Sequence, residues 1–388
     1  MDFQIGSLFD ILTSKKRFDA NKVALLTTGH PYVVRTSLNN GIKGYLNENV
    51  EYLNEGNTIS FGQDTATMFY QKDSYFTGDK IKIMKAKFPE FNAALAMYFI
   101  ATMGRAFSNF SWGSSSFSVE IIKKQIITLP TLNDKLAFSY MEEVIKALET
   151  ERIETLEAYL TVTGLKDYQL SKKDEEILDT FTGLTTLESR AEQSRAEQSS
   201  MILRLINLSE FLNWCDGISE LNPLRLDELT DNSEQEYPFY GQSTTDNGII
   251  EYRRLRKSVL NNKDGKPTIL IHSNNQNIVY LESPFYLKDG HGATSVLQSE
   301  TLNRYTALYI MTATKKVIVQ RFNYNAKATK IGLKETEILL PSSKGRIEND
   351  FMSEFIRVIE KLVIRDLVEW TDKKLKITKE VVWGESIY

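Results

Sequence analysis

The stretch PYVVRTSLNNGIKGYL (31–46) returns in altered form as YPFYGQSTTDNGIIEYR (237–253). Both copies hold an Asn-Gly-Ile core, at Asn40-Gly41-Ile42 and at Asn247-Gly248-Ile249, so the offset between them is 207 residues. An Asn-Gly pair between β-forming residues is a strong signal for a tight hairpin turn. The two stretches therefore raise the question of whether the whole chain is a duplication.

The similarity between the two halves continues well beyond this turn. The segment ALAMYFIAT (94–102) corresponds to TALYIMTAT (306–314), and IITLP corresponds to EILLP. Further along, SYMEEVIKALE from Ser139 matches DFMSEFIRVIE from Asp350. Order and residue character are kept while the offset drifts only from 207 to 211, as small loop insertions would produce. We therefore predict two copies of one structural unit.

Each copy has the pattern of an α+β domain. Short runs of β-forming residues such as NTISF and PTILIH lie between turns rich in Gly, Asn and Asp, and are expected to form strands. The segments FNAALAMYFIATM and RYTALYIMTAT are apolar around most of a helical circumference, which predicts short buried helices.

A long amphipathic helix is predicted at the end of each copy. The first runs from Asn133 to about Leu160 and would be about 42 Å long. Apolar residues recur at spacings of three and four, which is typical of a coiled-coil seam. The seam positions are Phe138, Met141, Ile145 and Leu148 in the first helix and Met352, Ile356, Ile359 and Val363 in the second.

Each seam must be buried, and the simplest partner for one helix is the other. We expect an α+β protein in which two domains related by a pseudo-two-fold axis are separated by a pair of long antiparallel helices. The predicted segments are a first domain at 1–131, a helix and acidic connector at 132–200, a second domain at 201–342, and a helix and tail at 343–388.

The charge of the chain is distributed unevenly. The net charge is -4, but residues 1–130 hold 14 Lys and Arg against 11 Asp and Glu, a balance of +3. Residues 237–341 hold 14 against 8, a balance of +6, whereas residues 133–200 hold 8 against 15, a balance of -7. The two repeated bodies are therefore basic, which permits a surface that faces nucleic-acid phosphates in each.

Known catalytic and metal-binding patterns are absent from the sequence. The three histidines have no metal-ligand spacing, and neither a phosphate-binding loop nor a Gly-x-Ser-x-Gly elbow is found. We expect no metal, no cofactor and no catalysis by this chain. One cysteine, no signal peptide and no long apolar run indicate a cytoplasmic protein without a membrane segment.

Polar side chains that can bind base edges gather in matching loops of the two copies. Asn and Gln suit adenine, Arg suits guanine and Asp suits the cytosine amino group, whereas other Lys and Arg suit phosphates. The alternative is that the Asn-Gly segments are only hairpin turns. The candidate DNA-binding residues are Arg35, Thr36, Ser37, Asn39, Asn40, Lys43, Gln63 and Asp64 in the first copy, and Gln242, Ser243, Thr244, Asn247, Arg253, Arg254, Ser273, Asn274, Asn275, Lys315, Lys316 and Arg321 in the second.

Over essentially its whole length, the chain resembles the specificity (S) subunit of type I restriction-modification enzymes. The resemblance rests on PYVVRTSLNNGIKGYL, on NTISFGQDTATMFYQKDSYFTGDKIKI, on the Leu-Pro that leads into a helix, and on the second round of the same pattern. It implies two target-recognition domains, each reading one half of a split double-stranded DNA sequence. It also implies that the helices form an antiparallel coiled coil that sets the gap and docks two methyltransferase (M) subunits, joined by an endonuclease-translocase (R) subunit.

Two alternatives stay open at this point. Similar S subunits serve type IIB systems, in which one partner polypeptide fuses nuclease and methyltransferase. The same duplicated frame could also be a protein-interaction scaffold that binds no DNA. Salt dependence distinguishes the latter, because binding to duplex DNA weakens steeply as the salt concentration rises.

Overall fold

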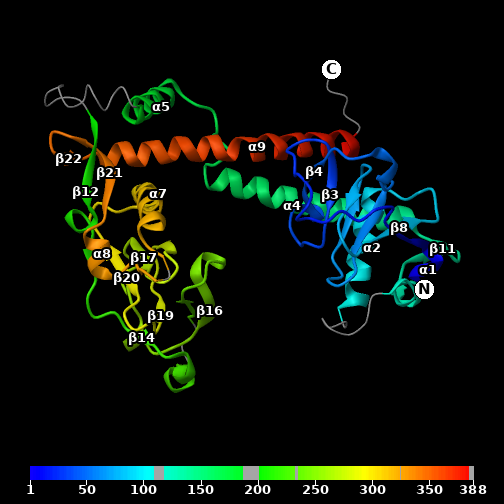
Figure 1. The fold of residues 1–388 in the computed structure, drawn as a ribbon, viewed down its shortest axis with the longest axis horizontal. Helices are drawn as coiled ribbons and strands as arrows, with labels where there is room; N and C mark the ends of the chain where they lie inside the picture. The colour runs from blue at the N-terminus through cyan, green and yellow to red at the C-terminus, as the bar shows by residue number, and fades with distance from the viewer. Residues whose placement is uncertain (109–117, 187–200, 232–234, 324, 384–388) are drawn as a thin grey trace. The chain divides into compact units, whose positions relative to one another are not determined.

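The computed structural model describes residues 1–108, 118–186, 201–231, 235–323 and 325–383, with side chains up to residue 377. These residues form two compact units (Figure 1). The first unit comprises Met1–Ala158 with Thr371–Tyr388, and the second comprises Tyr159–Trp370. The segment boundaries at 131, 200 and 342 stay predictions, and part of the acidic connector, 187–200, lies outside the described residues.

The first unit is built on a four-stranded sheet of order β2-β8-β5-β6 and a three-stranded sheet of order β4-β3-β7. Its elements are β1 (Asp2–Gln4), α1 (Ile5–Leu8), β2 (Phe9–Thr13), β3 (His30–Val33), β4 (Ile42–Leu46), β5 (Thr58–Gly62), β6 (Met68–Gln71), β7 (Phe76–Thr77), β8 (Ile81–Ala86), α2 (Ala93–Phe107), α3 (Val119–Lys124), β9 (Ile126–Thr128), β10 (Thr131–Leu132), β11 (Lys135–Leu136) and most of α4 (Phe138–Val162). Strand β5 is buried along its whole length and is one of the two inner strands of the four-stranded sheet, beside β8.

The second unit repeats this plan with sheets of order β13-β20-β17-β18 and β14-β19-β15-β16. Its elements are α5 (Lys172–Thr185), β12 (Ile202–Asn207), β13 (Asn213–Trp214), β14 (Glu220–Leu221), β15 (Tyr237–Tyr240), β16 (Ile249–Arg253), β17 (Thr268–His272), β18 (Ile278–Leu281), β19 (Tyr286–Lys288), β20 (Thr294–Gln298), α7 (Arg304–Arg321), α8 (Lys330–Lys334), β21 (Glu337–Ser343), β22 (Arg346–Ile347) and most of α9 (Asn349–Trp383). The α+β class and the two-domain plan are thus confirmed.

Local details repeat along with the strand order. In both units one sheet contains an equivalent parallel pair, β3 with β7 in the first and β15 with β19 in the second. A register shift falls at Tyr32/Val33 in one and at Phe239/Tyr240 in the other. These shared irregularities support the duplication, because a β-bulge is a specific feature that re-aims the residues following it.

The buried helices begin at equivalent caps. The side chain of Asn92 accepts a hydrogen bond from the backbone of Leu95 at the start of α2, and Asn303 does the same for Thr306 at the start of α7. An Asn cap satisfies amide groups that the first helical turn leaves without partners. Helix α2 then packs on β6 and β9, and α7 packs on the equivalent β18 and β21.

The beginning of each long helix is part of a domain core, which corrects the predicted seam. Phe138 stacks on Phe88 with ring centroids 4.8 Å apart, and Met141 is fully buried in the core of the first unit. Met352 is fully buried in the core of the second unit, and Ile356 packs beside it. The first turn of each helix therefore packs in the core of its own unit, and a seam between the two helices stays a prediction.

Other seam positions are more open. Leu148 is 49% exposed and Val363 is 76% exposed, whereas Ile145 and Ile359 are half-buried. Helix α4 begins at Phe138, because residues 131–136 form the β10-β11 hairpin. The pairing of the two long helices with each other stays a prediction.

Part of the acidic connector forms a helix that belongs to the second unit. Helix α5 begins at a capping box, in which Ser171 and Asp174 exchange hydrogen bonds. Its Phe181 stacks on Phe355 of α9 at 4.0 Å, and Lys361 pairs with Asp174 at 3.0 Å. This part of the connector, Lys172–Thr185, is therefore a structural element of the second unit.

Candidate nucleic-acid interface

The Asn-Gly turns have the same left-handed conformation in the two units. Asn39, Asn40 and Gly41 have φ angles of 47°, 53° and 77°, and the equivalent residues Asp246, Asn247 and Gly248 have 48°, 50° and 82°. Asn and Gly tolerate this region far better than other residues. The side chain of Asn40 donates to Tyr70 O at 3.0 Å, and that of Asn247 donates to Tyr280 O at 3.5 Å. These asparagines hold the turns in place.

In the first unit, the loop after β3 meets the loop between β5 and β6. The Arg35 guanidinium donates through Nη1 to Asp64 Oδ2, and Lys80 Nζ lies 2.9 Å from the same oxygen. The side chains of Arg35 and Asp64 are each 32% exposed. Two of the predicted residues are thus brought together in an accessible charged cluster, and Lys80 joins them.

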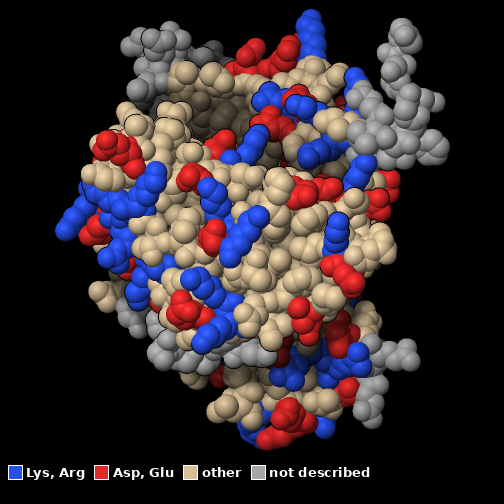
Figure 2. All heavy atoms as spheres, turned by 90° about the vertical axis from the view of Figure 1, so that its right-hand side faces the viewer, with Lys and Arg blue, Asp and Glu red and all other residues tan. Residues whose placement is uncertain are grey.

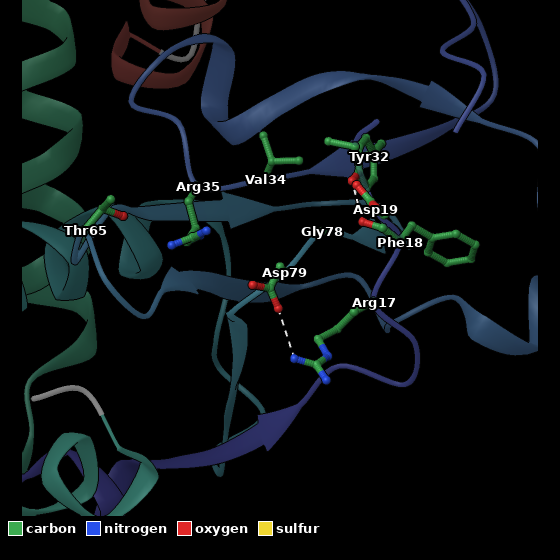
Figure 3. A pocket seen from close by; sticks show the side chains of 10 residues that line it. Arg17, Phe18, Asp19, Tyr32, Val34, Arg35, Thr65, Gly78 and Asp79 are labelled. Atoms are coloured by element: carbon green, nitrogen blue, oxygen red, sulfur yellow. Dashed lines mark hydrogen bonds and ion pairs between the residues drawn. The ribbon is translucent and has the colours of Figure 1, made fainter. Parts of the chain in front are cut away.

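Arg35 also lines a cavity of about 810 Å³ in the first unit (Figure 3). Arg17 reaches toward this cavity from the loop before β3, and its Nη1 pairs with Asp79 Oδ1 at 3.0 Å. Tyr32 and Thr65 also line this cavity, and the Tyr32 hydroxyl donates to Phe18 O at 2.7 Å. Two guanidinium groups therefore face one hollow, each with a carboxylate partner.

In the second unit, the same two loops are joined by amide groups. Asn274 Nδ2 donates to Gln242 Oε1 at 2.7 Å, at the position where Arg35 and Asp64 meet in the first unit. Asn275 Nδ2 donates to Gln242 O at 2.7 Å, and Asn277 Nδ2 donates to Ser243 O at 2.8 Å. The contact between the two loops is thus electrically neutral here and consists of several hydrogen bonds.

The last residue of β5 also differs from the last residue of the equivalent strand β17. Gly62 ends β5, and a Cβ there would lie 2.5 Å from the hydroxyl oxygens of both Thr65 and Thr67. The equivalent residue His272 is 0% exposed, and its Nδ1 lies 2.9 Å from Thr294 Oγ1. Burial lowers the pKa of His272 to about 4, because the charged ring would lose its hydration.

The other candidates of the first unit divide into turn-forming and accessible residues. Asn39 Nδ2 donates to Ile42 O at 3.0 Å, and Thr36 Oγ1 accepts from the Leu38 backbone at 3.2 Å. Ser37 and Lys43 are exposed, and Gln63 is half-buried. Ser37 and Lys43 therefore combine exposure with a chemistry suited to DNA, although only Arg35 and Asp64 form a cross-loop pair.

Several candidates of the second unit have structural partners. Ser273 is buried, and its carbonyl accepts from Ala328 N at 3.1 Å. Lys315 Nζ donates to Gln276 O at 2.6 Å, and Arg321 Nη1 donates to Glu335 O at 3.0 Å. The contacts of Lys315 and Arg321 fasten α7 to neighbouring loops, and DNA contact by these three residues stays a prediction.

The remaining basic candidates lie elsewhere on the second unit. Arg253 pairs with Glu251 at 2.8 Å and Arg254 pairs with Glu236 at 3.0 Å, whereas Lys316 borders an apolar cavity beside α7. Ser243 and Thr245 share a hydroxyl contact of 2.9 Å, and Thr244 is exposed. None of this tests DNA contact, which stays a prediction for all of them.

Sequence reasoning missed Lys80, Arg17, Asp79 and Asn277. Lys80 and Asp79 stand in the TGDK turn before β8, and the sequence offers no sign that this turn closes onto the β5-β6 loop. Asn277 could have been found, because it continues the amide run Asn274-Asn275-Gln276. The missed residues extend the loop cluster and do not create a separate one.

Charges of both signs are mixed over the surface. Figure 2 shows Lys and Arg interspersed with Asp and Glu on the face in view, without one continuous basic stripe. Among the described residues, no group of three or more His, Cys, Asp or Glu is placed to hold a metal ion. Within the same part of the chain, no helix is long and apolar enough to span a membrane.

Comparison with known proteins gives consistent matches. The family model of the type I restriction modification DNA specificity domain matches residues 1–158 and 217–369. A relative from Heyndrickxia coagulans, the type II restriction enzyme BgcI specificity subunit S.BcgI, is 24% identical over 369 residues, covering 93% of this chain and 95% of that protein. The crystal structure of a type I restriction-modification system S subunit from M. genitalium shares the fold, with a TM-score of 0.54 and 18% identity, covering 98% of this chain and 93% of the other.

Proposed function

Because this chain belongs to the family of type I restriction modification DNA specificity domains, we propose that each of its units reads one half of a split double-stranded DNA target. A subunit of this family supplies DNA recognition to a restriction-modification complex and is not itself an enzyme. The target is bipartite because there are two readers. It is asymmetric because the residues in the two sets of loops differ.

One observation carries this proposal. The two units keep the same strand order, the same β-bulge and the same left-handed turn around the loop that follows β3 or β15. Within that frame the first unit presents Arg35 with Asp64, and the second presents Gln242 with Asn274. A frame that is kept while its exposed hydrogen-bonding groups differ is what two readers of different half-sites require.

The long helices are proposed to set the distance between the half-sites. Helix α4 has 25 residues and is therefore about 38 Å long, comparable with the ~34 Å of one DNA turn. Removal of seven residues, two helical turns, from the exposed part of α4 should change the spacer of the target or abolish assembly. An unchanged spacer in a fully assembled complex would contradict this role.

The proposed partners are methyltransferase subunits, two per chain, and an endonuclease-translocase subunit. The duplication supports two methyltransferase sites, because each unit ends in an equivalent helix, α4 or α9. The alternative partner, a fused nuclease and methyltransferase, is retained because the matched relative is named as part of a type II enzyme. Affinity purification separates the two, since the first gives two kinds of partner polypeptide and the second gives one. We place the complex in the cytoplasm, where it meets cellular DNA.

The decisive experiment is modified-base sequencing of host DNA with the gene present, deleted and restored. We expect a bipartite methylated motif that disappears on deletion and returns on restoration. Methylation needs an active partner, so the assembled complex should also be tested for binding to a duplex library at low and high salt. Persistence of every motif, together with no salt-sensitive duplex binding, would overturn the proposal.

A further inference from the structure

Residues 35 and 242 occupy equivalent positions in the two units, and each is held by the equivalent residue of the facing loop, 64 or 274. We propose that 35 and 242 are the matched base-reading positions, with Arg35 taking a guanine in one half-site and Gln242 an adenine in the other. Asp64 and Asn274 are positioning residues that orient them. This inference rests on the proposed function, in which each unit reads one half-site.

The contacts of Arg35 leave a guanine-binding edge available. Asp64 engages Nη1, and the described residues give Nε and Nη2 no hydrogen-bond partner. A guanidinium has five N–H donors in a rigid fork, so one anchored nitrogen fixes the plane while the others can donate to O6 and N7 of a guanine. Lys80, 2.9 Å from Asp64, helps to fix the carboxylate.

The contacts of Gln242 leave an adenine-binding edge available. Asn274 uses one lone pair of Oε1, and the described residues give Nε2 no hydrogen-bond partner. An amide oxygen has a second lone pair, so it can accept from the adenine N6 amino group while Nε2 donates to N7. The backbone of Gln242 is itself fixed by Asn275, whose Nδ2 donates to its carbonyl oxygen at 2.7 Å.

The two pairs differ in a concerted way. Arg with Asp gives no net charge, and neither does Gln with Asn, whereas a mixed pair would leave an unbalanced charge between two loops. The third position differs too, because Lys80 adds one positive charge to the first cluster and Ala293 adds none to the second. Gln63 N donates to the carbonyl oxygen of Lys80, and the equivalent Ser273 N donates to that of Ala293, so the neutral pair has no lysine beside it. The reader and its surroundings have thus changed together.

The pair therefore predicts an exchange. The double substitution Arg35→Gln with Asp64→Asn keeps the net charge of the first unit and installs the pair of the second. Host DNA methylated by the complex that contains this variant is then sequenced. We expect the base recognised at one position of one half-site to change from guanine to adenine, with the preference for each of these bases changing by roughly 10-fold or more. The other half-site should stay unchanged.

The reciprocal exchange, Gln242→Arg with Asn274→Asp, should change the base recognised at one position of the other half-site from adenine to guanine. Lys85→Gln with Glu55→Gln is the matched control, because it also replaces an ion pair of the first unit by two neutral amides, at the end of the sheet away from the recognition loops. We expect it to leave the bases read unaltered. Circular dichroism and complex assembly show whether each variant is folded.

Outcomes for the inference and for the function are separable. A wild-type complex that methylates a bipartite motif, with an Arg35→Gln/Asp64→Asn variant that assembles and reads the same bases, overturns the inference and leaves the function standing. A switch produced equally by the Lys85 and Glu55 control would also overturn it. If the wild-type chain directs no motif at all, the proposed function fails first. If a double variant does not assemble, Arg35→Lys is used, which keeps the charge but loses the planar fork, and the inference requires guanine preference to fall.

Discussion

The first unit joins its two recognition loops by charge, and the second joins them by neutral hydrogen bonds. Arg35, Asp64 and Lys80 form the charged contact, whereas Asn274, Asn275 and Asn277 reach across to the loop that begins at Gln242. Ion pairs at an exposed site are weakened by salt, and amide contacts are not. The fold therefore fixes where the loops meet but leaves open the chemistry by which they meet.

A second difference lies directly beneath these loops. Gly62 leaves space that Thr65 and Thr67 fill with hydroxyl groups, whereas His272 fills its own space and is buried. A third difference is α5, which covers α9 in the second unit. Each difference can be tested by a change in one unit with its equivalent in the other as the control.

The largest expected effect is the pH dependence that His272 gives to the second unit. The folded chain holds its pKa at about 4, below the ordinary value of 6.5. The resulting stability is fully present above pH 6.5 and is lost as the pH falls from 6.5 through 4. Linkage gives a total of about 3 kcal/mol, of which about 2 kcal/mol is lost by pH 5.

Hydrogen exchange of β17 at pH 7 and pH 5, corrected for intrinsic rates, measures this loss. His272→Gln should remove that part of the pH dependence, while β5, where Gly62 stands in place of the histidine, should not respond to the substitution. Equal pH dependence of β17 in the wild type and the variant would contradict the assignment.

The next effect concerns the cover that α5 provides. Phe355→Ala removes a ring that stacks on Phe181 at 4.0 Å and contacts Tyr309 at 5.9 Å. We expect the free energy of unfolding of the second unit to fall by about 2 to 3 kcal/mol, less than the roughly 3 to 5 kcal/mol of a fully buried Phe→Ala change, because Phe355 is half-buried.

Val144 is the position of α4 equivalent to Phe355, so Val144→Ala is the matched control. It removes less apolar surface and should cost about 1 kcal/mol or less. Urea unfolding measures the loss of global stability in each variant. Hydrogen exchange in α5 then shows whether this helix is released locally. Unchanged protection of α5 in the Phe355 variant would show that the stacking does not hold this helix.

The smallest effect concerns the amide contacts between the loops. Asn277→Ala removes the bond to Ser243 O and should loosen the second loop pair by about 1 kcal/mol. The equivalent Thr67 has a hydroxyl contact of 2.8 Å with Thr65 inside its own loop, so Thr67→Ala should leave the first loop pair in place. Hydrogen-exchange rates of residues 242–245 and 35–38 measure the two results. If the Asn277 and Thr67 variants raised exchange equally in their own loops, the two loop contacts would not differ in this way.

The duplication, the fold class and the turn at Asn40-Gly41 could be predicted from sequence. Matching segments at a nearly constant offset reveal the duplication, and an Asn-Gly pair between β-forming residues is a local turn signal. The burial of Phe138 and Met141 in a domain core could not, since a spacing of three and four fits a core face as well as a seam. The pairs Arg35 with Asp64 and Gln242 with Asn274 could not be selected either. Their members are about 30 residues apart, and their meeting depends on how the β5-β6 and β17-β18 hairpins are placed.

The loop between the β-bulge at Tyr32/Val33 and the left-handed turn at Asn39–Gly41 has a consequence for how such proteins evolve. Its ends are fixed by backbone geometry that the rest of the unit maintains, so the residues between them form a short exchangeable cassette. Mutations within it alter what the surface recognises at little cost to folding. A lineage could therefore acquire new targets by small steps in a few codons, without exchanging a whole domain.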